Sequence, residues 1–418
     1  MSRSKREWER VPAHIPPTHY IDNSIYTSRE IFEEEMEKIF KKVWRFVCHE
    51  SELPNVYDFR TTTVAGVPLV IVRGADGVIR TFLNSCSHRG AVVVREAAGN
   101  AKSFRCLFHL WTYDTRGNCI SVTRGEGYEP HGCSKSDFGL REIRTKTHLG
   151  LVFINLDDNG ESFEDFFGDA FEDVEAILGS KPLEVFHFHS CILKTNWKNW
   201  NELNIEIYHE YLHSLNRLTS LAQPGYHDRE WKFYPHGHRV LQGPLLVDYT
   251  QYKGWKQRLG VPLPGLKVRE IKNWNLWPDF LMVARATCAR FDCMIPLSPT
   301  ETYVEFRGLG IKGESPEERT IRIADHNQVW GPFGRNLPED NAASEAQTPT
   351  MLGGLTPFSL MAREEGAKPQ TEGTLRHFYR EWESRIGRSA SAIHHFVGDT
   401  DSSSSAGSPL VTEVVGNQ

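Results

Sequence analysis

Two pairs of metal-binding side chains constrain this chain more than any other feature of its sequence. Cys86 and His88 form the first pair, and Cys106 and His109 form the second pair after seventeen intervening residues. Two cysteines and two histidines can hold a [2Fe–2S] cluster, with the thiolates on one iron and the imidazoles on the other. The neutral imidazoles raise the reduction potential above that of an all-cysteine cluster, so such a site accepts electrons readily.

The same four ligands could instead form a tetrahedral zinc site. Short apolar runs at 68–72 and 151–156 flank the two pairs, and turn signals at 74–77 and 114–117 lie beside them. These patterns predict strands joined by hairpins, with the ligands at loop tips. Zinc fingers usually carry one ligand pair near a helix, so the context favours the cluster. The stretch at about 40–155 resembles the Rieske domain.

The length and charge of the chain narrow the remaining choices. A chain of 418 residues is too long for a Rieske domain alone, and the net charge of −6 comes from charges of mixed sign. We therefore expect neither nucleic acid nor an anionic membrane as a partner. The polar start and the absence of a long apolar run predict a cytoplasmic protein. Six further cysteines without framework spacing are expected to be buried thiols: Cys48, Cys119, Cys133, Cys191, Cys288 and Cys293.

A second metal site is predicted downstream. On a helix, Glu206, His209 and His213 would share one face within roughly 60°. Two histidines and one carboxylate hold ferrous iron while three adjacent coordination positions stay open. The third ligand is expected from the segment 330–341, where two adjacent acids occur, and Asp340 is the preferred one. The alternative is a solvated polar helix face without a metal.

Three further motifs support a wider resemblance. They are the Asn-Trp-Lys-x3-Glu block at 196–202, the Tyr-His-x3-His block at 208–213 and the Gly-Pro-x-Gly block at 331–334. With the cysteine–histidine pairs, they resemble the α subunit of a Rieske non-haem iron aromatic ring-hydroxylating oxygenase, over about residues 25–390.

The resemblance implies site residues position by position. Cys86, His88, Cys106 and His109 would bind the [2Fe–2S] cluster, and His209, His213 and Asp340 would bind Fe²⁺. Glu206 stands where the family usually has Asp, and its carboxylate would link cluster and iron across a protomer boundary. Leu203 replaces a family Asn, and it would line the substrate pocket or pack in the core.

The expected fold class is α+β. Residues 40–155 would form an all-β Rieske domain, and residues 1–39 and 156–398 a catalytic iron domain with an antiparallel sheet flanked by helices. The Ser-rich segment 399–418 is expected to be disordered. Helices are predicted at 28–44, at 163–178, from Ser315 onward and at 371–388. Strands are predicted at 231–234, 239–241, 245–249, 280–286, 291–295 and 302–309.

The resemblance also implies an activity and its partners. The protein would use O2 and two electrons to hydroxylate a small aromatic substrate, with cis-dihydroxylation as the first expectation. No G-x-G-x-x-G fingerprint opens a βαβ unit, so the electrons would come from NAD(P)H through a separate reductase, with or without a ferredoxin. A homotrimer, or an α3β3 ring with a small β subunit, is expected. A Rieske monooxygenase and an electron carrier without oxygenase activity are the alternatives.

An aromatic carboxylate is the expected substrate, because the sequence looks closest to family members that act on such acids. A carboxylate needs a cation beside it, and Arg307 is a candidate, with Arg285 and Arg290 equally supported. Strand alternation groups Arg307 with Tyr303 and Glu305, so a solvent-exposed arginine is the alternative for Arg307.

Overall fold

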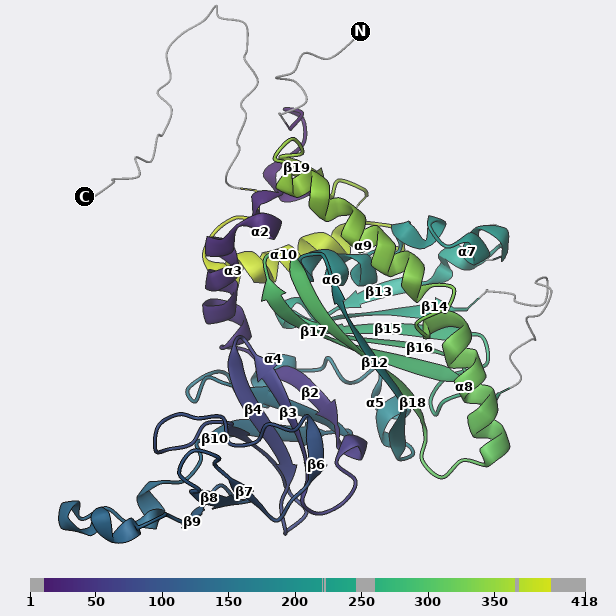
Figure 1. Cartoon of the computed structure of the whole chain (residues 1–418). Helices are drawn as coiled ribbons and strands as arrows, with labels where there is room; N and C mark the ends of the chain where they lie inside the picture. The colour runs from purple at the N-terminus through teal and green to yellow at the C-terminus, as the bar shows by residue number, and fades with distance from the viewer. Residues whose placement is uncertain (1–10, 220, 222, 246–259, 365–367, 392–418) are drawn as a thin grey trace, which may run out of the picture.

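The structure is a computed structural model that describes residues 11–219, 221, 223–245, 260–364 and 368–391. Two seven-stranded antiparallel sheets dominate these residues (Figure 1). The first sheet has the order β2-β11-β10-β5-β4-β3-β6. Its strands are β2 Arg45–His49, β3 Asp58–Val64, β4 Val67–Arg73, β5 Ile79–Leu83, β6 Ala98–Asn100, β10 Glu142–His148 and β11 Leu151–Asn155.

A small three-stranded sheet extends the first one. It consists of β7 Ser103–Arg105, β8 Thr112–Asp114 and β9 Cys119–Ser121, in the order β7-β8-β9. Cys86 lies in the loop after β5, and Cys106 directly follows β7. The prediction of ligands at loop tips between strands is therefore confirmed. Three short 3₁₀ turns follow β9, at Gly125–Gly127, Glu129–His131 and Lys135–Asp137.

The second sheet has the order β12-β18-β17-β16-β15-β14-β13. Its strands are β12 Leu183–Leu193, β13 Glu230–Phe233, β14 Arg239–Pro244, β15 Glu270–Leu276, β16 Phe280–Arg285, β17 Cys288–Ser298 and β18 Glu301–Ile311. Five of the predicted strands are confirmed, whereas 245–249 falls almost wholly outside the described residues. The sequence did not predict β12 or β15. The buried residues Asn273 and Asn275 interrupt the apolar pattern of β15. In a sequence, such polar residues are typical of a loop.

The two faces of the second sheet differ in chemistry. Directly opposed residues on neighbouring strands share a face. Val240, Trp274, Met282 and Phe291 are opposed in this way and belong to the main apolar core. The ring centroids of Phe46, in the first sheet, and Phe291 lie 6.0 Å apart. The apolar face of the second sheet therefore packs against the first sheet.

The opposite face of the second sheet carries polar side chains. Asn273 on β15 is in register with Val283 and Arg290 on the next two strands. The helices α6 Trp197–Ile205, α8 Pro316–Trp330 and α9 Leu337–Leu352 contact the second sheet (Figure 1). Asn273 donates to the Asn204 carbonyl of α6. The contact layer between the sheet and these helices is therefore polar.

The remaining elements surround this core. They are α2 Ser24–Thr27, α3 Arg29–Glu35, a π-helix Met36–Phe40, α4 Phe163–Phe167, α5 Glu175–Gly179, α7 Ser214–Thr219, α10 Gly373–Ile386 and the paired strands β1 Tyr20–Asp22 and β19 Phe358–Leu360. Short 3₁₀ helices lie at Pro17–His19, Glu50–Glu52, Tyr208–Tyr211, Tyr226–Asp228 and Pro235–Gly237. Within the described residues, no helix has the length and apolar character needed to span a bilayer.

The predicted helices fare unequally. The helix after Ser28 runs to Phe40, and the capping box of Ser315 with Glu318 begins α8 as predicted. The single helix at 163–178 is wrong, because the chain turns at Gly168 with φ +47° and forms the separate helices α4 and α5. The segment 399–418 lies outside the described residues.

Candidate metal centres

The two cysteine–histidine pairs occupy matching turns. Gly90 N–H donates to the Cys86 carbonyl at 2.8 Å, and Leu110 N–H donates to the Cys106 carbonyl at 3.0 Å. Gly90 and Leu110 both have positive φ, of 71° and 62°. Positive φ is costly for a branched residue such as leucine and persists where the surrounding structure enforces it. The two loops therefore present their ligands in equivalent conformations.

The four side chains of these loops converge. Nδ1 of His88 lies 3.1 Å from Nδ1 of His109, and both cysteines are buried beneath the half-buried histidines. The Tyr113 hydroxyl lies 3.1 Å from Cys86 Sγ and accepts from the Ser87 N–H. Two converging imidazole nitrogens above two buried thiols are the donor set that a mixed-ligand [2Fe–2S] cluster requires.

Aromatic and apolar side chains surround this donor set. The Trp111 ring stacks on His88 with centroids 4.8 Å apart and an interplanar angle of 10°. Leu107, Phe108 and Leu110 are each more than half exposed. The cluster loops thus present an apolar rim to the outside.

The second metal site does not lie on one helix face, so that part of the prediction is wrong. Helix α6 ends at Ile205, and Glu206 is extended with φ −115° and ψ 139°. His209 lies in the 3₁₀ turn Tyr208–Tyr211, and His213 precedes α7. The Glu206 carboxylate accepts the His209 backbone N–H at 3.1 Å. This local hydrogen bond competes with helical continuation.

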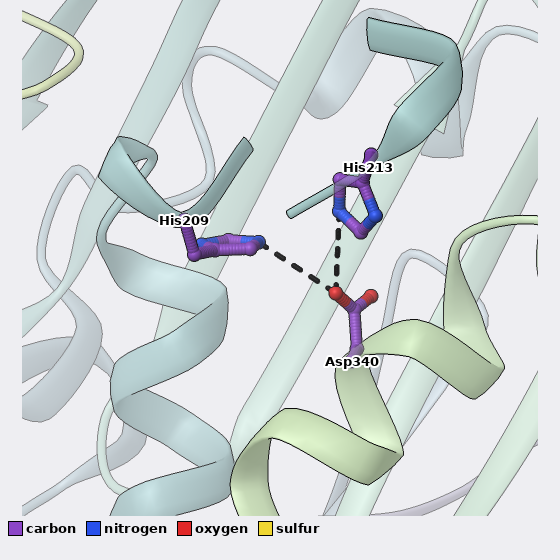
Figure 2. Close-up of side chains that lie close together, drawn as sticks. All are labelled: His209, His213 and Asp340. Atoms are coloured by element: carbon purple, nitrogen blue, oxygen red, sulfur yellow. Dashed lines mark ion pairs between the residues drawn. The ribbon is translucent and has the colours of Figure 1, made fainter. Parts of the chain in front are cut away.

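The predicted triad nevertheless assembles, as Figure 2 shows. Asp340, in the first turn of α9, places Oδ1 at 3.2 Å from His213 Nε2 and 3.7 Å from His209 Nε2. One ligand atom from each of the three residues lies within 4.8 Å of the others. Asp340 Oδ1 is buried and accepts no hydrogen bond from the described residues. A buried carboxylate oxygen facing two imidazole nitrogens fits a divalent metal ion.

Each histidine of the triad is oriented by a second carboxylate. Nδ1 of His209 lies 2.9 Å from Glu206 Oε1, and Nδ1 of His213 lies 2.8 Å from Glu339 Oε2. Each Nδ1–H then donates to its carboxylate, which leaves Nε2 with a lone pair for metal. The adjacent acids of α9 thus have different tasks, because Asp340 faces the metal position and Glu339 orients His213.

The electrostatics of the triad favour a cation. Burial alone would lower the pKa of His209, but the carboxylates of Glu206, Asp340 and Glu210 raise it to about 9. Burial would raise the pKa of Asp340, but the two histidines hold it below its ordinary value. A site that stabilises protonated imidazoles also stabilises a metal dication at the same place.

Known proteins share both halves of this arrangement. Family models for the Rieske [2Fe-2S] domain and for the ring hydroxylating alpha subunit (catalytic domain) match residues 43–128 and 180–388. The chain is 47% identical to the 2-aminobenzenesulfonate 2,3-dioxygenase subunit alpha of Alcaligenes sp, over 94% of this chain and 100% of that protein. It belongs to the Rieske ring-hydroxylating oxygenase α-subunit family.

Two further proteins are similar to this Rieske oxygenase α subunit. The methanesulfonate monooxygenase hydroxylase subunit alpha of Methylosulfonomonas methylovora is 39% identical, over 93% of this chain and 95% of that protein. Naphthalene 1,2-dioxygenase from Rhodococcus sp. has the same fold, with a TM-score of 0.77 at 22% identity over 88% of this chain and 94% of that chain. The cofactors of the α subunit are therefore a Rieske [2Fe–2S] cluster and a mononuclear iron at His209, His213 and Asp340.

The two predicted substrate residues of the oxygenase, Leu203 and Arg307, lie on different elements of the structure. Leu203 is buried on α6, one residue before Asn204, and its place in a pocket stays a prediction. Arg307 is buried on the apolar face of the second sheet, so the prediction of a solvent-exposed arginine is wrong. It donates to Glu52 at 2.8 Å and to Glu305 at 2.6 Å. Its charge is already matched by two carboxylates away from the polar face.

Sequence reasoning missed two supporting residues of the oxygenase. Glu339 was considered only as a rival metal ligand, and Tyr113 was not considered at all. Two adjacent acids near a histidine pair are a usable signal, since metal-bound histidines usually donate to a carboxylate. The Tyr113 contact depends on how β8 pairs with β7, which no motif in the sequence specifies.

Proposed function

We propose that this α subunit is the terminal oxygenase component that inserts oxygen from O2 into a small organosulfonate. The observation that carries the oxygenase chemistry is the triad of His209, His213 and Asp340 in a chain that also carries a Rieske cluster site. These three residues would hold a ferrous iron, which would supply the activation of dioxygen. The two most similar relatives named above both act on sulfonates by name, which supports sulfonate over the carboxylate expected from the sequence.

We propose dioxygenation of an aromatic sulfonate to a cis-diol as the first reaction. The relative at 47% identity is a dioxygenase of an aminobenzenesulfonate, and it matches over its whole length. Monooxygenation is the second candidate, because the relative at 39% identity is a monooxygenase. Both reactions use the same ligands, so only the product separates them.

The roles of the residues follow from their contacts. Glu206 and Glu339 each accept an Nδ1–H and hold the imidazoles of His209 and His213 with Nε2 toward the metal position. Asp340 supplies the anionic ligand. We assign the cluster to Cys86, His88, Cys106 and His109, and the catalytic domain to residues 1–39 and 156–398 around the Rieske domain at 40–155.

Glu206 is proposed to carry electrons between protomers. The β7–β9 sheet beside the cluster loops and the helix α7, which follows His213, lie on opposite sides of the molecule (Figure 1). A head-to-tail ring would bring the cluster of one protomer to the iron of the next. We propose a homotrimer or an α3β3 ring, supplied from NAD(P)H by a separate reductase with or without a ferredoxin. The six cysteines outside the cluster site form no disulfide, which supports a reducing, cytoplasmic location.

The test is a single-turnover reaction with the fully loaded oxygenase. The protein is reduced without oxygen and then exposed to ¹⁸O2 with 2-aminobenzenesulfonate, methanesulfonate or anthranilate, and the products are analysed by mass spectrometry. A sulfonate-derived product with two labelled atoms supports dioxygenation, and one labelled atom supports monooxygenation. Conversion of anthranilate without conversion of either sulfonate would overturn the proposal of a sulfonate substrate. An electron carrier would give no substrate-dependent oxygen uptake, which would overturn the oxygenase.

A further inference from the structure

Two arginines project from the polar face of the second sheet, on the side that α6 and α8 contact. Arg290 on β17 is in register with Val283 on β16, and Arg285 lies two residues beyond Val283 on the same face. Both side chains are buried, and their guanidinium carbons lie 5.5 and 5.7 Å from the centre of the Trp330 ring. A buried cation next to an aromatic ring is a suitable environment for an aromatic acid.

Arg290 is held rigidly by two neighbours. Its Nη2 donates to Asp292 Oδ2 at 2.8 Å and to Asn204 Oδ1 at 3.1 Å. Its Nε lies 2.8 Å from Asp292 Oδ1. These contacts fix the plane of the guanidinium, which reduces the entropy lost when the group forms another hydrogen bond.

The Nη1 group of the same guanidinium takes part in neither of these hydrogen bonds. Arg290 is 2% exposed, both of its hydrogen bonds within the described residues come from Nη2, and its buried Nε forms none. A guanidinium offers five N–H donors, and leaving buried donors unmatched is costly. A ligand that accepts hydrogen bonds would remove this cost.

The position of Arg290 relates it to the iron site. Asn204, which Arg290 contacts, lies two residues before Glu206 at the end of α6. Phe306, 5.8 Å from the guanidinium carbon, adds an aromatic ring on the same side.

We infer that Arg290 binds the anionic group of the substrate through Nη1 and thereby sets the specificity of the oxygenase for aromatic acids. The inference rests on the proposed function, which supplies a substrate with a sulfonate. Sulfonate and carboxylate share the oxyanion that an arginine recognises by charge-assisted hydrogen bonds. Arg307 cannot take this role, because it lies opposite Phe291 on the other face of the sheet.

The test compares charged and neutral ligands in the intact oxygenase loaded with cluster and iron. Calorimetry without oxygen measures the Kd of 2-aminobenzenesulfonate and of its neutral analogue 2-aminobenzenesulfonamide, and steady-state assays measure KM for both. Arg290→Met should weaken binding of the sulfonate roughly 10- to 100-fold, the loss of about one charge-assisted hydrogen bond. The Kd of the sulfonamide should change little, and Arg290→Lys should restore part of the sulfonate affinity.

The controls separate this role from a structural one. Arg285→Met removes the other arginine beside Trp330, and thermal melting with cluster absorbance checks that each variant is folded and loaded. Equal losses for the charged and the neutral ligand in both Arg290→Met and Arg290→Lys would overturn the inference. A selective loss of the sulfonate in Arg285→Met alone would also overturn it, in favour of Arg285.

Failure of the proposed function gives a different result. If the wild-type protein converts anthranilate but no sulfonate, the same comparison with anthranilate and 2-aminobenzamide tests Arg290 directly. If the wild-type protein binds neither acid more tightly than its neutral analogue, the inference is overturned whatever the reaction is.

Discussion

At the scale of single residues, the iron site is defined by pairs of one imidazole and one carboxylate. His209 is paired with Glu206 and His213 with Glu339, while Asp340 faces both Nε2 atoms. The residue types and their spacing suffice to predict the two histidine ligands and an acidic third ligand. They do not tell which of two adjacent acids binds metal, because that depends on how the first turn of α9 is rotated toward His213.

Replacement of Glu339 tests whether its carboxylate orients His213 while Asp340 binds the metal. Glu339→Gln keeps the shape of the side chain but removes the charge that His213 Nδ1–H meets, so the iron affinity should fall roughly 10- to 100-fold. Titration with ferrous iron under anaerobic conditions measures the affinity directly. Glu317→Gln, an exposed acid of the neighbouring helix α8, serves as the matched control. An unchanged affinity in Glu339→Gln would show that the contact with His213 does not orient the ligand.

Glu202 provides a pH-dependent prediction at the same scale. Burial raises the pKa of Glu202 from 4.5 to about 7, and the hydroxyl groups of Tyr26 and Tyr379 donate to it. The folded protein therefore binds this proton more tightly than the unfolded chain. The resulting stability is present below pH 4.5 and is lost as the pH rises toward 7.

The measurement compares unfolding of the wild-type protein with that of Glu202→Gln between pH 5 and pH 8. The amide cannot ionise, so the variant should gain roughly 1–3 kcal/mol relative to the wild type over this range. A stability difference that does not change with pH would contradict the raised pKa.

At the scale of elements, buried polar groups fix helices that the sequence only partly predicts. Hydrophobic spacing predicts the helices after Ser28 and at 371–388, but it does not predict α9, which contains Pro338 and Pro349 and lacks a regular apolar stripe. The expected helix through Glu206 and His213 fails for a related reason. A side-chain hydrogen bond to the backbone is stronger locally than helix propensity, and periodicity cannot register it.

Buried contacts of Glu35 link the helices α3, α6 and α10. Glu35 of α3 is fully buried, receives Lys198 Nζ of α6 at 2.5 Å and accepts the indole N–H of Trp382 of α10 at 2.8 Å. Lys198→Met leaves the carboxylate buried without its cation, which should cost about 3–5 kcal/mol of stability. Denaturant titration measures this loss. The exposed Lys194, paired with Glu301, is the control, and Lys194→Met should cost less than about 1 kcal/mol.

At the scale of the whole molecule, the second sheet is buried on both faces, and this explains the error over Arg307. Alternation along β18 correctly separates Arg307 from Phe306, but it cannot tell what covers each face. The first sheet covers the face of Arg307, and Glu52 and Arg60 complete a buried charge cluster with Arg307 and Glu305. This cluster and the contact of Phe46 with Phe291 fix the two sheets relative to each other.

Because the two sheets are fixed in this way, we do not expect a hinge movement to bring the cluster to the iron of the same chain. A head-to-tail ring predicts complementation between two inactive variants. His109→Ala removes a proposed cluster ligand, and His213→Ala removes an iron ligand. When both are co-expressed with different tags and purified as mixed rings of three, one in three neighbouring pairs combines an intact cluster with an intact iron site in the productive order. The mixed rings should therefore show about a third of the wild-type activity per chain, whereas each variant alone should show none. Transfer within one chain predicts no activity in the mixed rings either, since no single chain then has both intact sites.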